Sequence, residues 1–185
     1  MISTSDFKNG INILVNSDPY QIIWFQNHKP GKGGAIMRVK LKHLKKKNII
    51  ERTFKSGEKF KILNVIKQKK QFLYRKGENY IFIDMNTYEQ TSISNTILGE
   101  TINFLTENLN VDAIYVENEL ICIELPSTIV VTVSETDPGI KGDSVANLTK
   151  IAKLETGAVI RVPIFIKNGD KIKIGTKNGE YMERI

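Results

Sequence analysis

The sequence has few of the residues that build metal sites and disulfides. Its 185 residues include one cysteine, Cys122, and two histidines, His28 and His43. A lone cysteine forms no internal disulfide, which fits a reducing compartment such as the cytoplasm. One thiol and two imidazoles are also too few for a tetrahedral zinc site. We therefore expect no metal and no cofactor, and Cys122, which lies between two isoleucines, is interpreted as a buried apolar residue.

Long hydrophobic runs are also missing. No apolar stretch approaches the ~20 residues of a membrane-spanning helix. The N-terminal residues 1–6 lack the basic and apolar regions of a signal peptide. Helical periodicity is scarce, and the best candidate is one short helix over residues 99–105. The sequence therefore predicts a cytoplasmic protein without membrane partners.

The motifs of common enzyme classes are absent as well. There is no G-x-S-x-G nucleophile elbow and no H-E-x-x-H zinc motif. A P-loop is excluded because Gln26 replaces its first glycine, and Gly33 follows Lys32 where a hydroxyl residue is needed. A nucleophilic lysine would need burial, whereas Lys32 is predicted to be exposed. We expect no catalytic residues, and an enzyme with Lys32 as a Schiff-base nucleophile is only an alternative.

What the sequence does contain is a glycine-rich loop with a lysine at its centre. Glycine tolerates positive φ and proline fixes φ near about −65°, so these residues predict a tight turn. The segment 35–42 behind the loop alternates apolar with mostly basic residues, as a half-buried strand does. We predict a β-hairpin with Lys32 at its tip, with a turn that has no function as the alternative. The tip loop consists of Lys29, Pro30, Gly31, Lys32, Gly33 and Gly34.

Positive charge is concentrated in the first third of the chain. The net charge is +7, but residues 1–64 carry +9, residues 65–127 carry −4 and residues 128–185 carry +2. This asymmetry indicates that a polyanion meets the first third, with a merely solvated basic surface as the alternative. The candidates for contacts with the phosphates of such a polyanion are Arg38, Lys40, Lys42, Lys45, Lys46 and Lys47.

Short strand patterns separated by turn residues fill the chain. Five short strands are expected within about the first 65 residues, and the later segments have similar patterns. Such patterns predict an all-β protein, and segments of about 60 residues have the size of small barrels. We expect three domains, 1–64, 65–127 and 128–185. Outside the first domain the expected strands are 65–66, 71–74, 80–83, 86–91, 111–116, 120–125, 128–133, 158–166 and 171–174.

Three stretches carry a resemblance to a known family. The first is 29–41, with the lysine loop and the strand behind it. The second is 136–143, which reads Thr-Asp-Pro-Gly-Ile-Lys-Gly-Asp, and the third is 150–169, which contains Arg-Val-Pro-Ile-Phe-Ile. Together they resemble the bacterial elongation factor P family, and the similarity runs through the whole chain in one register.

The resemblance implies a fold and a function. The fold would be an SH3-like (KOW-like) barrel followed by two OB-fold barrels. The protein would be a monomer that binds the ribosome between the peptidyl and exit sites and rescues synthesis stalled at consecutive prolines. Lys32, extended in many relatives by a modifying enzyme, would position the acceptor end of the peptidyl-tRNA. Ribosomal RNA, ribosomal proteins and peptidyl-tRNA are therefore the expected partners.

Two further expectations concern other parts of the chain. The resemblance implies that the loop with Asp137, Gly142 and Asp143 contacts messenger RNA, although plain turn residues are the alternative and the segment 144–150 departs from the family pattern. An alternative function is a generic RNA- or single-strand-binding OB-fold protein. Its stacking platforms would be Tyr74, Tyr80 and Phe82, although alternate ones of these residues are expected to belong to the core.

Overall fold

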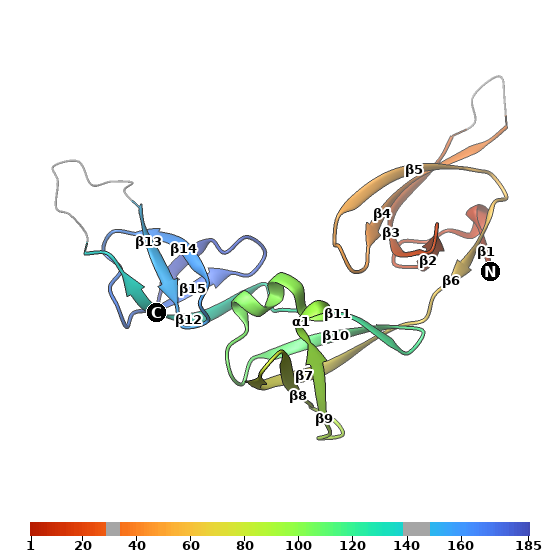
Figure 1. Cartoon of the computed structure of the whole chain (residues 1–185). Helices are drawn as coiled ribbons and strands as arrows, with labels where there is room; N and C mark the ends of the chain where they lie inside the picture. Colours follow the sequence, from red (N-terminus) through yellow and green to blue (C-terminus); the bar gives the residue numbers. More distant parts are fainter. Residues whose placement is uncertain (29–33, 139–148) are drawn as a thin grey trace. The chain divides into compact units, whose positions relative to one another are not determined.

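Most of the described residues lie in β-strands (Figure 1). The computed structural model describes residues 1–28, 34–138 and 149–185. The described residues form two compact units, one of residues 1–67 with 114–122 and one of residues 68–113 with 123–185. Three curled antiparallel sheets account for the strands, which confirms the predicted all-β class. In the described part of the chain, no helix has the length and apolarity that crossing a bilayer requires.

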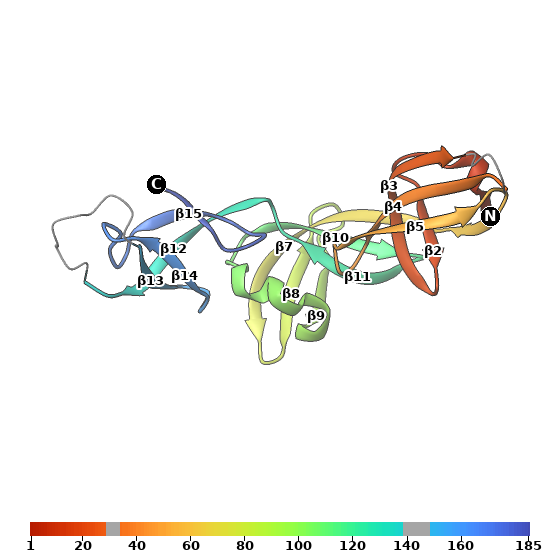
Figure 2. The same cartoon turned by 90° about the horizontal axis from the view of Figure 1, so that it is seen from above.

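The first sheet has six strands in the order β1-β6-β2-β3-β4-β5 and curls into a small barrel (Figure 2). We expected five strands. The structure has six. The difference arises because β1 and β6, with two and four residues, are too short to show a period of two in the sequence. The strands are β1 (Ile2–Ser3), β2 (Asn12–Val15), β3 (Asp18–His28), β4 (Ile36–His43), β5 (Ile49–Lys55) and β6 (Lys59–Ile62).

The alternation in β4 builds the core of this barrel. Met37, Val39 and Leu41 point inward and are buried, while Arg38 and Lys40 point outward and are exposed. Each buried side chain of this kind stabilises the fold by about 1.5–3 kcal/mol relative to exposure. The predicted half-buried strand with a basic outer side is therefore confirmed.

The second sheet has the order β11-β10-β7-β8-β9. We expected two separate strands at 65–66 and 71–74. The structure has one continuous strand there, and the polar residues between the two segments hid this continuity in the sequence. The strand expected at 86–91 begins only at Gln90, after a turn. The residues expected as a helix, 99–105, form a 3₁₀ helix from Gly99 (φ 55°) to Phe104, and a short α-helix, α1 (Asn95–Leu98), precedes it. The strands are β7 (Val65–Lys76), β8 (Asn79–Asp84), β9 (Gln90–Ser94), β10 (Asn110–Val116) and β11 (Glu119–Glu124).

The third sheet has the order β14-β13-β12-β15-β16 around a core that includes Val133, Val162 and Ile172. Sequence patterns missed β13 and β16, which are short and rich in charged residues. The strand expected at 158–166 ends at Pro163, which has no N–H for a further ladder bond. The strands are β12 (Thr128–Thr136), β13 (Thr149–Leu154), β14 (Val159–Pro163), β15 (Lys171–Gly175) and β16 (Tyr181–Arg184).

An ion pair is buried within the second sheet. The Nζ atom of Lys70, a residue 3% exposed, lies 3.4 Å from Oδ2 of Asp84, which is 7% exposed. The other carboxylate oxygen accepts hydrogen bonds from the N–H groups of Asn86 at 2.8 Å and Thr87 at 3.1 Å. These N–H groups, with a smaller contribution from Lys70, hold the pKa of Asp84 below its ordinary value of 3.8.

This lowered pKa makes part of the stability depend on pH. A carboxyl group with a lower pKa in the folded state stabilises the fold above its unfolded pKa, and this contribution is lost as pH falls through the folded pKa. We expect Asp84→Asn to be less stable than the wild type at pH 7, with a difference that shrinks below about pH 3.8. Urea denaturation from pH 2 to pH 7 measures this, and the exposed Asp6→Asn is the control. A difference that stays constant with pH would contradict the assignment.

Candidate nucleic-acid interface

The β3–β4 hairpin carries most of the predicted site. The two strands pair in antiparallel register from Tyr20 opposite His43 to His28 opposite Ile36. At about 3.3 Å per residue, the eight residues of β4 span roughly 26 Å. Gly34 is exposed, and a Cβ built on it would meet no atom within 4 Å. The other residues of the predicted tip, Lys29, Pro30, Gly31, Lys32 and Gly33, lie outside the described residues.

The outward side of β4 is a row of cations. Arg38 and Lys40 are exposed, and Lys42 is half-buried. Across the ladder to β5, Arg38 pairs with Thr53 and Lys42 pairs with Ile49, so neither faces a carboxylate there. Lys40 faces Glu51. We call Arg38, Lys40 and Lys42 the basic row, and it is available to meet a polyanion.

The turn after β4 presents three more lysines. Lys45 and Lys46 are exposed, and Lys47 is half-buried with a left-handed backbone (φ 61°). The ring of His43, a residue 3% exposed, organises the turn. Its Nδ1 accepts hydrogen bonds from the N–H groups of Lys45 at 3.1 Å and Lys46 at 3.2 Å.

Backbone bonds close the same turn. His43 donates its N–H to the carbonyl of Asn48 at 2.9 Å, and Lys47 donates to the carbonyl of His43 at 3.0 Å. Because Nδ1 accepts two N–H groups, it carries no proton in this arrangement, and the ring proton is on Nε2, 3.6 Å from Oδ1 of Asp18. Sequence reasoning considered His43 only as a metal ligand and missed this role.

The predicted loop of the third sheet is described only at its ends. Asp137 is exposed and follows β12, and its carbonyl accepts a hydrogen bond from Nζ of Lys150 at 2.6 Å. This bond joins residues on either side of the segment 139–148. Gly142 and Asp143 lie outside the described residues, so their predicted contact with messenger RNA stays a prediction.

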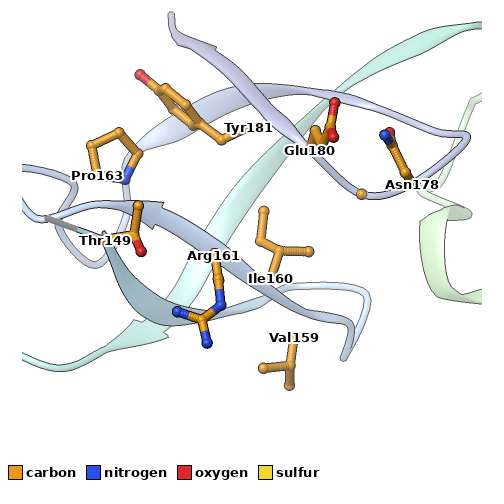
Figure 3. A pocket seen from close by; sticks show the side chains of 9 residues that line it. Thr149, Val159, Ile160, Arg161, Pro163, Asn178, Glu180 and Tyr181 are labelled. Atoms are coloured by element: carbon orange, nitrogen blue, oxygen red, sulfur yellow. The ribbon is translucent and has the colours of Figure 1, made fainter. Parts of the chain in front are cut away.

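A shallow hollow lies next to the start of β13 (Figure 3). It has a volume of about 510 Å³. Strand β14, with Arg161 and Pro163, forms one wall, and the turn that leads into β16 forms the other. Its lining residues are Thr149, Val159, Ile160, Arg161, Pro163, Asn178, Gly179, Glu180 and Tyr181.

The stacking platform that the alternative function would need is mostly absent from the second sheet, as expected for residues that belong in part to the core. Phe82 is fully buried and Tyr80 is only 5% exposed, and both rings pack against Phe72 in the core. Tyr74 alone is exposed, at 45%. The register shift between Phe72 and Tyr74 explains the difference, because it breaks the alternation along β7. Among the described residues, no group of three His, Cys, Asp or Glu side chains could hold a metal ion.

Fold and site together define a protein of three small β-barrels whose first barrel has a long hairpin with a cationic outer side. Comparison with family models matches all three. Residues 3–60 match the elongation factor P (EF-P) KOW-like domain, residues 65–123 match the EF-P OB domain, and residues 129–184 match the elongation factor P C-terminal model.

Full-length relatives give the same result. The chain is 67% identical over 184 residues to elongation factor P of Endomicrobium trichonymphae and 47% identical to that of Moorella thermoacetica, with 100% of each chain covered. The chain belongs to the elongation factor P family of translation elongation factors. The resemblance seen in the sequence and the predicted barrel fold are thus confirmed.

A solved structure supports the fold alone. A translation initiation factor eIF-5A family protein from Naegleria fowleri superposes with a TM-score of 0.52 at 15% identity. The match covers 67% of this chain and 96% of that one.

The domain boundaries at 64/65 and 127/128 stay a prediction. The three sheets occupy residues 2–62, 65–124 and 128–184.

Proposed function

We propose that this elongation factor binds the ribosome next to the peptidyl-tRNA and promotes peptide-bond formation at consecutive-proline stalls. The observation that supports this most directly is the β3–β4 hairpin. It carries the basic row on the outward side of β4, which also pairs along its length with β5, and it leads to a loop in which Lys32 lies between two glycines. A glycine-rich loop suits entry into an RNA cavity, where bulky side chains would clash.

Positioning is the contribution that such a factor can make. The ribosome already supplies the reaction centre, and a prolyl nucleophile is a secondary amine that reacts slowly. Correct placement of reacting groups contributes up to about 7–11 kcal/mol in favourable cases. Lys32 would supply a compact cation with three donors, as a free amine or through a group added by a modifying enzyme. No catalytic residue of the chain itself is required.

The remaining candidate residues would hold the factor in place. The basic row and the lysines of the following turn would contact phosphates of ribosomal RNA and tRNA, as contacts that are independent of base sequence. The loop containing Asp137, Gly142 and Asp143 would reach the messenger. Ribosomal proteins complete the expected partners, and the factor would act as a monomer.

Reconstituted translation tests this function. We expect the purified protein to raise the yield of a reporter that contains a run of three prolines, and to leave unchanged a reporter in which alanines replace them. A generic RNA-binding protein would affect both reporters alike or neither. Equal effects on the two reporters would overturn the proposal.

A further inference from the structure

Trp24 is the only tryptophan of the chain, and it points away from the core. Tyr20 and Ile22 are buried, so strict alternation along β3 would place residue 24 inside as well. The register shifts between Ile22 and Trp24, and this irregularity reverses the alternation. As a result Trp24 is 38% exposed, while Phe25 packs against the core instead.

The exposed indole is part of the same surface as the basic row. Lys40 is its cross-strand partner, and Nζ of Lys40 lies 5.5 Å from the centre of the ring. Arg38 and Lys42 are two residues to either side of Lys40 on the same outward face of β4. An exposed indole with one ammonium group over its ring, next to two further cations on β4, is therefore presented at the middle of the hairpin.

The composition of this surface favours RNA as its partner. Among the described residues of β3, β4 and β5, the large exposed hydrophobic residues are Trp24 and Ile49, and the other exposed neighbours are polar or charged. The core of a protein–protein interface is depleted of charged residues, whereas this surface is rich in them. Proteins that bind single-stranded nucleic acid combine a cationic groove with aromatic rings on which bases stack.

We propose that Trp24 stacks on an unpaired nucleobase of ribosome-bound RNA, while Arg38 and Lys42 contact the phosphates that flank this base. This inference rests on the proposed ribosome binding and adds a base contact to it. Stacking on an aromatic ring is tolerant of base identity because every base has a π-face. Trp24 would therefore add affinity without selecting a sequence.

Two variants of Trp24 separate stacking from other roles. Trp24→Phe keeps an aromatic face, and Trp24→Leu keeps only apolar volume. With 70S ribosomes that carry tRNA in the peptidyl site, we expect Trp24→Leu to bind roughly 5- to 150-fold more weakly in sedimentation assays. Trp24→Phe should keep most of the affinity. The salt dependence of Trp24→Leu should match the wild type, because no charge is lost.

Ultraviolet crosslinking of the wild-type complex gives a second readout that does not depend on folding of a variant. We expect a nucleotide adduct on the peptide that contains Trp24. Equal affinity of wild type and Trp24→Leu, or an adduct to ribosomal protein alone, would overturn the stacking proposal and leave the proposed function intact. Absence of ribosome binding by the wild type would overturn both.

Discussion

Lys32→Ala is expected to abolish the effect on proline-run reporters while leaving most of the ribosome affinity. The reason is that the basic row and the three lysines of the following turn are retained, and they would supply the phosphate contacts. Lys32 would act only at the reaction centre, where placement controls the rate. If the variant raised the activation free energy of peptide-bond formation by even about 4 kcal/mol, the rate would fall about 1,000-fold. Rescue should therefore disappear.

Two controls define this result. Lys8→Ala removes the same charge from an exposed position of the same barrel and should rescue normally. Lys32→Arg keeps the charge but replaces the compact amine with a planar guanidinium, and it removes the site for modification of Lys32.

An intact-mass spectrum of the protein from its native host, with a mass excess located on peptide 28–38, would identify the modification. Normal rescue by Lys32→Ala would contradict the assigned role of Lys32.

The fold could largely be predicted from the sequence because period-two patterns are local. β4 and β8 show the alternation within their own residues, and their burial follows it. The elements that were missed depend on neighbours instead. β1 has two residues and is a strand only because it pairs with β6, and β13 pairs with both β12 and β14. Pairing partners of this kind are not visible in a local pattern.

The candidate site likewise contains residues that could be placed from the sequence and residues that could not. The outward position of Arg38 and Lys40 followed from alternation, and the structure agrees. Trp24 could not be placed, because a register shift reverses the face of every later residue in a strand and leaves no clear mark in the sequence. The role of His43 was also hidden, since its two donors are backbone N–H groups.

Replacing Lys45, Lys46 and Lys47 together by alanine is expected to weaken ribosome binding strongly. His43 fixes the backbone of this turn, so the lysines are presented from a rigid base. Each phosphate contact contributes about 0.7–0.9 to the slope of log K against log salt. If all three lysines contact phosphates, the slope should fall by about 2–3, with a loss of affinity on the order of 100-fold at about 0.1 M salt.

A second triple variant distinguishes local contacts from overall charge. Lys8, Lys59 and Lys61 are exposed residues of the same barrel outside the hairpin, and their replacement by alanine removes the same charge. Long-range attraction alone would make the two triple variants equally weak, because it depends on total charge. Direct phosphate contact by the turn predicts a much smaller change of slope for the second variant. Equal slopes for the two variants would therefore show that the turn after β4 does not touch RNA.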